Sequence, residues 1–296
     1  MAERLQLSIA DLTIGFVSGF PRLAAEAPRK FFAPFRSEGR VDLRLTVECG
    51  NLPRVRPEAR LFDAVSPHRW RLSREDGHYV FEIFDTRSPY ARFQVARVDP
   101  AWREVEVHTR PVGSAKGQPA WSLARLMQPL GQLLLIQRLS QGRGALLHGL
   151  GIIDRGRGLV FVGASGAGKS TLANLYAETA TDATVLNDEH IAVVKRGERF
   201  WVFSTPWPGA HFKVCAGGAP IHRIYVLEHD STNRRLAEHP ARLCALLAQQ
   251  MFLPFWSREA LASALRVAEE LVEAIPTCRL GFVNDARIIE FLREEA

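Results

Sequence analysis

The stretch Gly158–Ala180, GLVFVGASGAGKSTLANLYAETA, decides the fold of the second half of the chain. It opens with Leu159–Val162, a short apolar run typical of a buried strand, and from Lys169 onward its apolar residues recur at helical spacing. Between these parts, Gly163–Thr171 meets the pattern G-x-x-x-x-G-K-[S/T]. Glycine allows the backbone to curl so that consecutive N–H groups point inward, and the start of the helix adds a partial positive charge. The sequence therefore predicts a strand, a phosphate-binding loop and a helix.

The loop predicts a bound nucleoside triphosphate with Mg²⁺. The side chain of Lys169 can supply a mobile positive charge to the β and γ phosphates, and the hydroxyl of Ser170 can ligate Mg²⁺. The residues expected to contact the nucleotide are those of the whole loop: Gly163, Ala164, Ser165, Gly166, Ala167, Gly168, Lys169, Ser170 and Thr171.

An acidic corner, VLNDEH at Val185–His190, follows the helix at the end of another apolar strand. In a phosphate-loop protein a carboxylate at this strand end faces the nucleotide, where it can hold Mg²⁺ or its water. Because Asp188 and Glu189 are adjacent, an extended backbone would point them to opposite sides. We expect Asp188 to face the site and Glu189 to be either a second metal ligand or a surface residue. The alternative for the pair is a polar hairpin corner without function.

The remaining pattern indicates two domains. Between residues 41 and 110, the stretches VDLRLTVE, HYVFEIFD, RFQVARVD and REVEVHTR alternate apolar and polar residues, which predicts antiparallel strands with one solvated face. Residues 121–139 are apolar at helical spacing, with a break at Pro129 and Gly131. We expect an α/β protein: a mixed-sheet nucleotide-binding domain over residues 121–296, preceded by a smaller β-rich domain over residues 1–120 that could recognise a substrate or partner.

Composition and charge exclude several classes of function. The net charge of +6 suits a nucleotide or an acidic partner, but no nucleic-acid-binding module is recognisable, so no nucleic-acid partner is predicted. There is no membrane-length apolar run and no signal-peptide layout, which predicts a cytoplasmic protein without a membrane partner. The cysteines lie far apart without metal-ligand spacing, and reduced thiols are expected at Cys49, Cys215, Cys244 and Cys278.

The ordered motifs resemble a known family. LLHGLGIIDRGRGLVFVGASGAGKST at residues 146–171, followed by VLNDEHIAVV at residues 185–194, resembles the kinase domain of HPr kinase/phosphorylase. That family places a His-Gly pair on the strand before the loop and two acids on the strand after its helix. NDEH is also similar to the acidic metal motif of the ATP-dependent phosphoenolpyruvate carboxykinases, which share this nucleotide-binding fold. The resemblance covers roughly residues 143–230.

The resemblance implies phosphorylation of a serine hydroxyl on a protein or peptide, with ATP and Mg²⁺ as cofactors. It makes Asp188 the general base and Ser170 a metal ligand, and it gives Glu189 the place of the second acid. His148 would lie near the transferred phosphate beside Lys169, although a histidine in an apolar strand can equally be a buried core residue. Because the family assembles as hexamers, a homo-oligomer is a further expectation.

The sequence also departs from the family pattern. The second acid is Glu instead of Asp, and the family's glycine-rich region with a further metal-binding carboxylate is not recognisable. In its place stands FSTPWPGAHF at residues 203–212, which offers Thr205, Gly209 and His211 but no acid, and whose Trp207 could line the site or pack as part of a rigid loop.

Two alternatives for the function stay open. One is a small-molecule kinase, because adenylylsulfate kinases carry a similar loop, and the other is a non-enzymatic binding module that responds to ATP.

Overall fold

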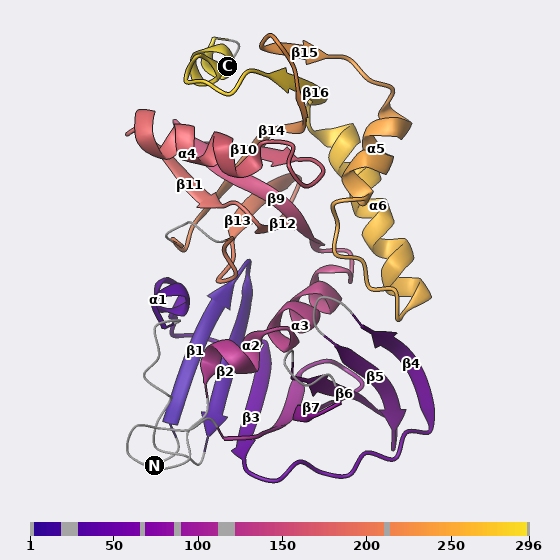
Figure 1. The fold of residues 1–296 in the computed structure, drawn as a ribbon. Coiled ribbons are helices and arrows are strands. Elements are labelled where there is room, and N and C mark those ends of the chain that lie inside the picture. Colours follow the sequence, from indigo (N-terminus) through magenta and orange to yellow (C-terminus); the bar gives the residue numbers. More distant parts are fainter. Residues whose placement is uncertain are drawn as a thin grey trace. The chain divides into compact units, whose positions relative to one another are not determined.

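The computed structural model describes residues 3–18, 29–65, 69–85, 90–111, 122–209 and 214–294. The protein is a strand-rich α/β protein with two mixed sheets (Figure 1). It divides into two compact units, one of Met1–Arg138 with Phe255–Ser257 and one of Leu139–Pro254 with Arg258–Ala296. Among the described residues, no helix is long and apolar enough to cross a membrane.

The first unit contains an eight-stranded sheet in the order β1-β2-β3-β8-β7-β6-β5-β4. Its strands are β1 Glu3–Ile9, β2 Leu12–Ser18, β3 Leu43–Cys49, β4 Ala59–Ala64, β5 Trp70–Glu75, β6 His78–Phe84, β7 Arg92–Val98 and β8 Glu104–Thr109. Its helical elements are α1 Arg29–Phe32, the 3₁₀ turn η1 Ala33–Phe35, α2 Leu123–Met127 and α3 Leu130–Leu139. The predicted alternation is clearest in β3, where Leu43, Leu45 and Val47 are buried and the residues between them are exposed.

This sheet is mixed, whereas the sequence predicted an antiparallel one. β3 pairs in parallel with both β2 and β8, and the other pairings in the sheet are antiparallel. An alternation of apolar and polar residues indicates which face of a strand is buried, but it does not indicate whether the neighbouring strand is parallel or antiparallel. Residues 19–42 separate β2 from β3, and strands β4 to β7 come between β3 and β8, so neither parallel pairing required a short hairpin.

The helical segment after β8 is broken at Pro129, as the sequence predicted: α2 ends at Met127 and α3 begins at Leu130. Contacts hold α2 against the first unit. The amide of Gln94 donates to the carbonyl of Leu126 (3.3 Å), and Arg125 pairs with Asp85 (3.0 Å). The first compact unit, which runs to Arg138, accordingly includes α2.

The second unit is built on a sheet in the order β10-β9-β12-β13-β14-β16-β15, with β11 also paired to β9. Because β10 pairs with β14 as well as with β9, the pairings close a ring through β10, β9, β12, β13 and β14. The strands are β9 Gly144–Asp154, β10 Arg157–Val162, β11 Ala183–Asn187, β12 His190–Arg196, β13 Arg199–Ser204, β14 Gly218–His229, β15 Arg234–Leu236 and β16 Thr277–Phe282. The helices are α4 Lys169–Thr179, α5 Pro240–Ala248, α6 Arg258–Ala274 and α7 Arg287–Arg293.

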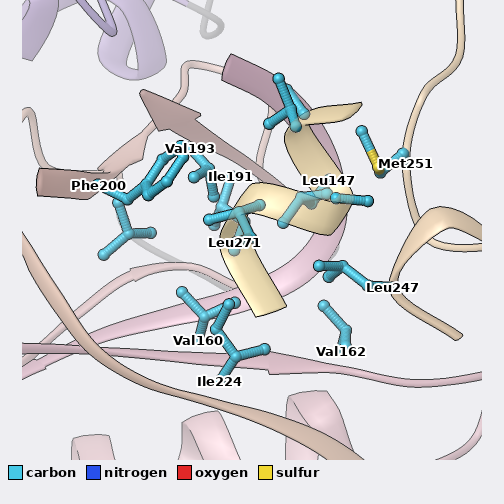
Figure 2. Packing of buried hydrophobic residues seen from close by; sticks show 14 of the residues in the cluster. Leu147, Val160, Val162, Ile191, Val193, Phe200, Ile224, Leu247, Met251 and Leu271 are labelled. Atoms are coloured by element: carbon cyan, nitrogen blue, oxygen red, sulfur yellow. The ribbon is translucent and has the colours of Figure 1, made fainter. Parts of the chain in front are cut away.

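Two apolar clusters fix β10, the strand that leads into the phosphate loop. Val160 and Val162 belong to the cluster between the sheet and helices α5 and α6 (Figure 2). The alternate residues Leu159 and Phe161 belong to the cluster under α4 and α7, which also contains Tyr176 of α4. Both faces of β10 are buried, which explains why its sequence is continuously apolar. The loop thus starts from a strand that is packed on both sides.

Candidate functional site

The sheet register brings the predicted site residues to one edge. Val162, the last residue of β10, is paired with Gly149 of β9. His148, the residue before Gly149, is paired with His190 of β12. The backbone N–H of Gly149 also donates to the carbonyl oxygen of Glu189 (3.2 Å). The phosphate loop, His148 and the acidic corner, three segments distant in sequence, therefore lie next to one another.

Two glycines of the loop have a left-handed backbone conformation. Gly166 and Gly168 have φ angles of 82° and 98°, in the left-handed region that glycine adopts without strain. Gly168 is the N-cap of α4, and no side chain caps this end. A Cβ at Gly168 would lie 2.6 Å from the ring of Phe282, so the position also lacks space for a side chain. The first N–H groups of α4 have no acceptor within the helix, and with the helix dipole they favour a phosphate oxygen.

Lys169 is a buried cation in the mouth of the loop. It is 7% exposed, and its Nζ donates to the carbonyl oxygens of Gly163 (2.7 Å) and Ala164 (3.3 Å). Burial lowers the pKa of Lys169, while the nearby carboxylates of Glu189 and Asp188 raise it. A buried ammonium group without a directly bonded anion is unfavourable, and a phosphate would compensate it. The residues of the loop thus fit a phosphate chain.

Asp188 connects the acidic corner to the start of α4. It is 2% exposed; its Oδ2 accepts a hydrogen bond from the hydroxyl of Ser170 (3.2 Å) and its Oδ1 accepts one from the N–H of Gly209 (3.1 Å). Among the described residues no group of three or more His, Cys, Asp or Glu side chains could hold a metal ion. Mg²⁺ is typically held by one or two carboxylates together with phosphate oxygens and water, so a Ser–Asp pair beside a phosphate loop fits this ion.

His148 and Glu189 form the more open part of the site. The Nε2 of His148 lies 3.7 Å from Oε2 of Glu189, and their side chains are 35% and 40% exposed. Burial and the charge of Lys169 lower the pKa of His148, and the carboxylates of Glu189 and Asp188 raise it. His148 is therefore half-exposed beside the loop and is not enclosed in the apolar core.

Sequence reasoning missed Asn187, the residue that fixes the acidic corner. Its side chain is 1% exposed, and its Oδ1 accepts hydrogen bonds from the N–H groups of Glu189 (2.8 Å) and His190 (3.0 Å). Its Nδ2 donates to the carbonyl oxygens of Thr205 (3.0 Å) and Trp207 (3.3 Å). One amide thus sets the turn that carries the acids and attaches it to the segment after β13. An asparagine at the start of a turn is a recognisable signal, because its side chain commonly bonds the backbone two residues on.

The described part of the segment that replaces the glycine-rich region, residues 203–209, packs against the acidic corner. Trp207 is buried, and its carbonyl oxygen faces both Asn187 and Nδ1 of His190 (3.1 Å). The hydroxyl of Thr205 donates to the carbonyl oxygen of His190 (2.7 Å). The N–H of Gly209 donates to the carboxylate of Asp188. His211 lies outside the described residues.

The arrangement combines a cradle of backbone N–H groups, a buried cation, a hydroxyl–carboxylate pair and a half-exposed His–Glu pair. These groups can hold a phosphate chain with a divalent cation and place a carboxylate near it. No protein-family model matches the chain, and no curated protein matches it either. Its function is therefore inferred from the geometry of this site.

Proposed function

We propose that the protein is an ATP- and Mg²⁺-dependent kinase of the HPr-kinase type that transfers the γ-phosphate to a Ser or Thr hydroxyl of a protein or peptide. The observation that carries this proposal is the 3.2 Å contact between the Ser170 hydroxyl and Asp188 Oδ2, immediately after the buried Lys169. It joins the phosphate loop to a carboxylate from the following strand, which is what nucleotide-bound Mg²⁺ requires.

The roles follow from the position of each group. The N–H groups of the loop bind phosphate oxygens, and Lys169 neutralises charge on the β and γ phosphates. Ser170, Asp188 and Glu189 are the residues that would hold Mg²⁺, which when bound supplies further positive charge to the transferred group. His148, on the other side of Glu189, orients that carboxylate and adds a hydrogen-bond donor near the phosphates.

Asp188 is proposed as the general base that accepts the proton of the attacking hydroxyl. Both of its oxygens already have a partner, Ser170 on one side and Gly209 on the other. The second acid, Glu189, is more open and has a histidine at 3.7 Å. Substituting the two acids separately distinguishes the base from a residue that only binds metal.

The acceptor is proposed to be a hydroxyl on a polypeptide because the ordered set of His148, the loop and the two acids resembles protein-serine kinases. A small-molecule kinase shares the loop but not the His-Gly strand before it. An ATP-responsive binding module would need the same nucleotide cradle and no base. Each class predicts a different fate for the γ-phosphate.

The proposal is tested by incubating the protein with Mg²⁺, γ-labelled ATP and the polypeptides encoded beside it, followed by mass spectrometry. We expect label on one Ser or Thr, abolished by Asp188→Asn and by Lys169→Ala. The matched control is Asp182→Asn, which makes the same change at an exposed carboxylate after the far end of α4. Glu189→Gln should reduce transfer without abolishing it if Glu189 only supports the metal.

Three results would contradict parts of the proposal. Full transfer by Asp188→Asn would show that Asp188 is not the base. ADP release that depends on a metabolite, with no label on any polypeptide, would identify a small-molecule kinase. Tight ATP binding with no transfer, together with partner affinity that rises with ATP, would identify a binding module.

A further inference from the structure

A second cluster of positive charge lies at the opposite end of β10 from the phosphate loop. β10 runs from Arg157 to Val162, so its first residue is about 20 Å from the loop at 3.3 Å per residue. At this end a small hollow is lined by several charged or titratable side chains. They are Arg157, Arg223, Arg235, Arg293, His222 and one carboxylate, Asp154.

The single carboxylate of this hollow is already neutralised. Asp154 is buried, and Arg293 of α7 binds it with two hydrogen bonds, Nε to Oδ2 (2.9 Å) and Nη2 to Oδ1 (2.7 Å). The hydroxyl of Tyr176 lies 3.4 Å from Oδ2. Asp154 therefore has little negative charge left to offer the other three arginines.

Those three arginines line the same hollow. In the described part of the chain, neither Arg157 nor Arg223 forms an ion pair with a carboxylate, and both are partly buried. The pKa of His222 is lowered first by burial and then by the positive charges of Arg157 and Arg223. Arg235 contributes a further charge, with its guanidinium 5.0 Å from the ring of Phe291. Like charges in a partly desolvated hollow are unfavourable, and an anion bound among them reverses the sign of the interaction.

A β-bulge directs two consecutive residues into the hollow. Gly158 of β10 is paired with Ile221 of β14, but the next residue, Leu159, is paired with Arg223, so His222 is the extra residue. In a regular strand, neighbours point to opposite faces, yet both His222 and Arg223 line this hollow. Bulges that re-aim a side chain are over-represented next to functional sites.

The hollow continues into a wider one. A neighbouring hollow of about 360 Å³ shares Arg157 and His222 with it. Its other lining residues include Glu198 of the turn before β13 and Arg199 and Phe200 of β13. The small hollow itself has about 10 Å³ of free space, room for about one water molecule, so the bulk of a ligand would lie in the wider hollow, to which Arg157 and His222 also contribute.

We propose that Arg157, His222, Arg223 and Arg235 form a second oxyanion site, which binds the phosphate group of a small ligand at the end of the sheet opposite the nucleotide. Guanidinium groups bind phosphate oxygens bidentately, and a neutral histidine can donate a further hydrogen bond. This site is independent of the proposed transfer reaction, since none of its residues belongs to the phosphate loop or the acidic corner.

Calorimetry on the full chain carrying Lys169→Ala tests the site, because this change removes the main charge of the phosphate loop and leaves the hollow intact. The probes are inorganic phosphate and phenyl phosphate. We expect saturable binding of both in this background, weakened about tenfold or more by Arg157→Ala and by Arg223→Ala. The matched control is Arg155→Ala, two residues away, whose side chain instead contacts Asp182 (3.2 Å) and should leave affinity unchanged.

Thermal unfolding of each variant shows whether a loss of affinity reflects loss of the fold. Arg157→Lys, which keeps the positive charge, should retain an intermediate affinity for phosphate. The absence of phosphate binding in the Lys169→Ala protein would overturn the proposal, as would unchanged affinity in folded Arg157→Ala and Arg223→Ala proteins. If phenyl phosphate binds much more tightly than inorganic phosphate, the natural ligand is an ester; equal affinity assigns the site to the free ion.

Discussion

Removing the side chain of Asn187 is expected to destabilise the protein far more than removal of an ordinary partly buried asparagine. Its amide makes four hydrogen bonds of 2.8–3.3 Å, two accepted from the backbone of the acidic corner and two donated to the segment after β13. At a net value of about 1 kcal/mol for each bond, Asn187→Ala should lower the free energy of unfolding by about 4 kcal/mol. Of the four backbone groups left behind, those of Thr205 and Trp207 lie in buried residues and those of Glu189 and His190 in half-buried ones.

Asn233→Ala is the matched control. The Oδ1 of Asn233 accepts a single hydrogen bond, from the N–H of Val283 (2.9 Å), so its loss should cost about 1 kcal/mol. Urea unfolding of both variants gives the difference, and hydrogen exchange locates it: the amides of Glu189 and His190 should lose protection in Asn187→Ala alone. Equal destabilisation by the two substitutions, or unchanged exchange at Glu189 and His190, would refute the role given to Asn187.

Three further predictions follow from single contacts. Gly209→Ala places a Cβ 2.9 Å from both oxygens of Asp188, so we expect the free energy of unfolding to fall by about 1–3 kcal/mol and the transfer rate to fall at least tenfold. A variant with unchanged stability and transfer rate would show that this carboxylate can move freely. Burial lowers the pKa of His190 to about 4, so the stability that depends on its neutral form is complete above about pH 6.5 and is lost as the pH falls toward 4, about 3 kcal/mol in all. In urea unfolding, the stability of His190→Gln should therefore fall less steeply between about pH 6.5 and about pH 4 than that of the unsubstituted protein. An identical pH dependence of the two proteins would contradict this. Arg293→Ala removes both hydrogen bonds that a guanidinium group gives to the buried carboxylate of Asp154 and should cost about 3–5 kcal/mol. Arg287→Ala removes an exposed ion pair and should leave the stability nearly unchanged, so similar melting temperatures for the two variants would refute the distinction.

Several elements could be predicted from the sequence because their signals are local. The apolar run Leu159–Val162, the glycines of Gly163–Gly168 and the helical pattern after Lys169 each restrict the backbone within a few residues. The structure has β10, the loop and α4 at these positions. The break at Pro129 is equally local, since proline lacks the N–H that a helix interior requires.

The pairing of strands could not be predicted in the same way. The alternation in β3 identified its buried face, but its two parallel neighbours are contributed by residues far away in the chain. The closure of the second sheet by β10 and β14 likewise depends on a contact between strands that are separated in the chain by residues 163–217. Periodicity is a property of one strand, whereas direction and order are properties of the assembled sheet.

The sequence by itself determined that a glycine-rich loop joins a strand to a helix and which residues compose it, because that conformation depends on glycine, lysine and a helix start that are adjacent in the chain. Only the tertiary structure decided what surrounds the loop. The pairing of β9 with β10 and β12 brings His148 and Glu189 beside it, and the amide of Asn187 fixes the turn from which Asp188 reaches Ser170. The bulge at His222 is also decided at this level, since it exists only in the register between β10 and β14. Hydrogen bonds between distant segments have no counterpart in local sequence pattern, and these bonds set the geometry on which the proposed chemistry depends.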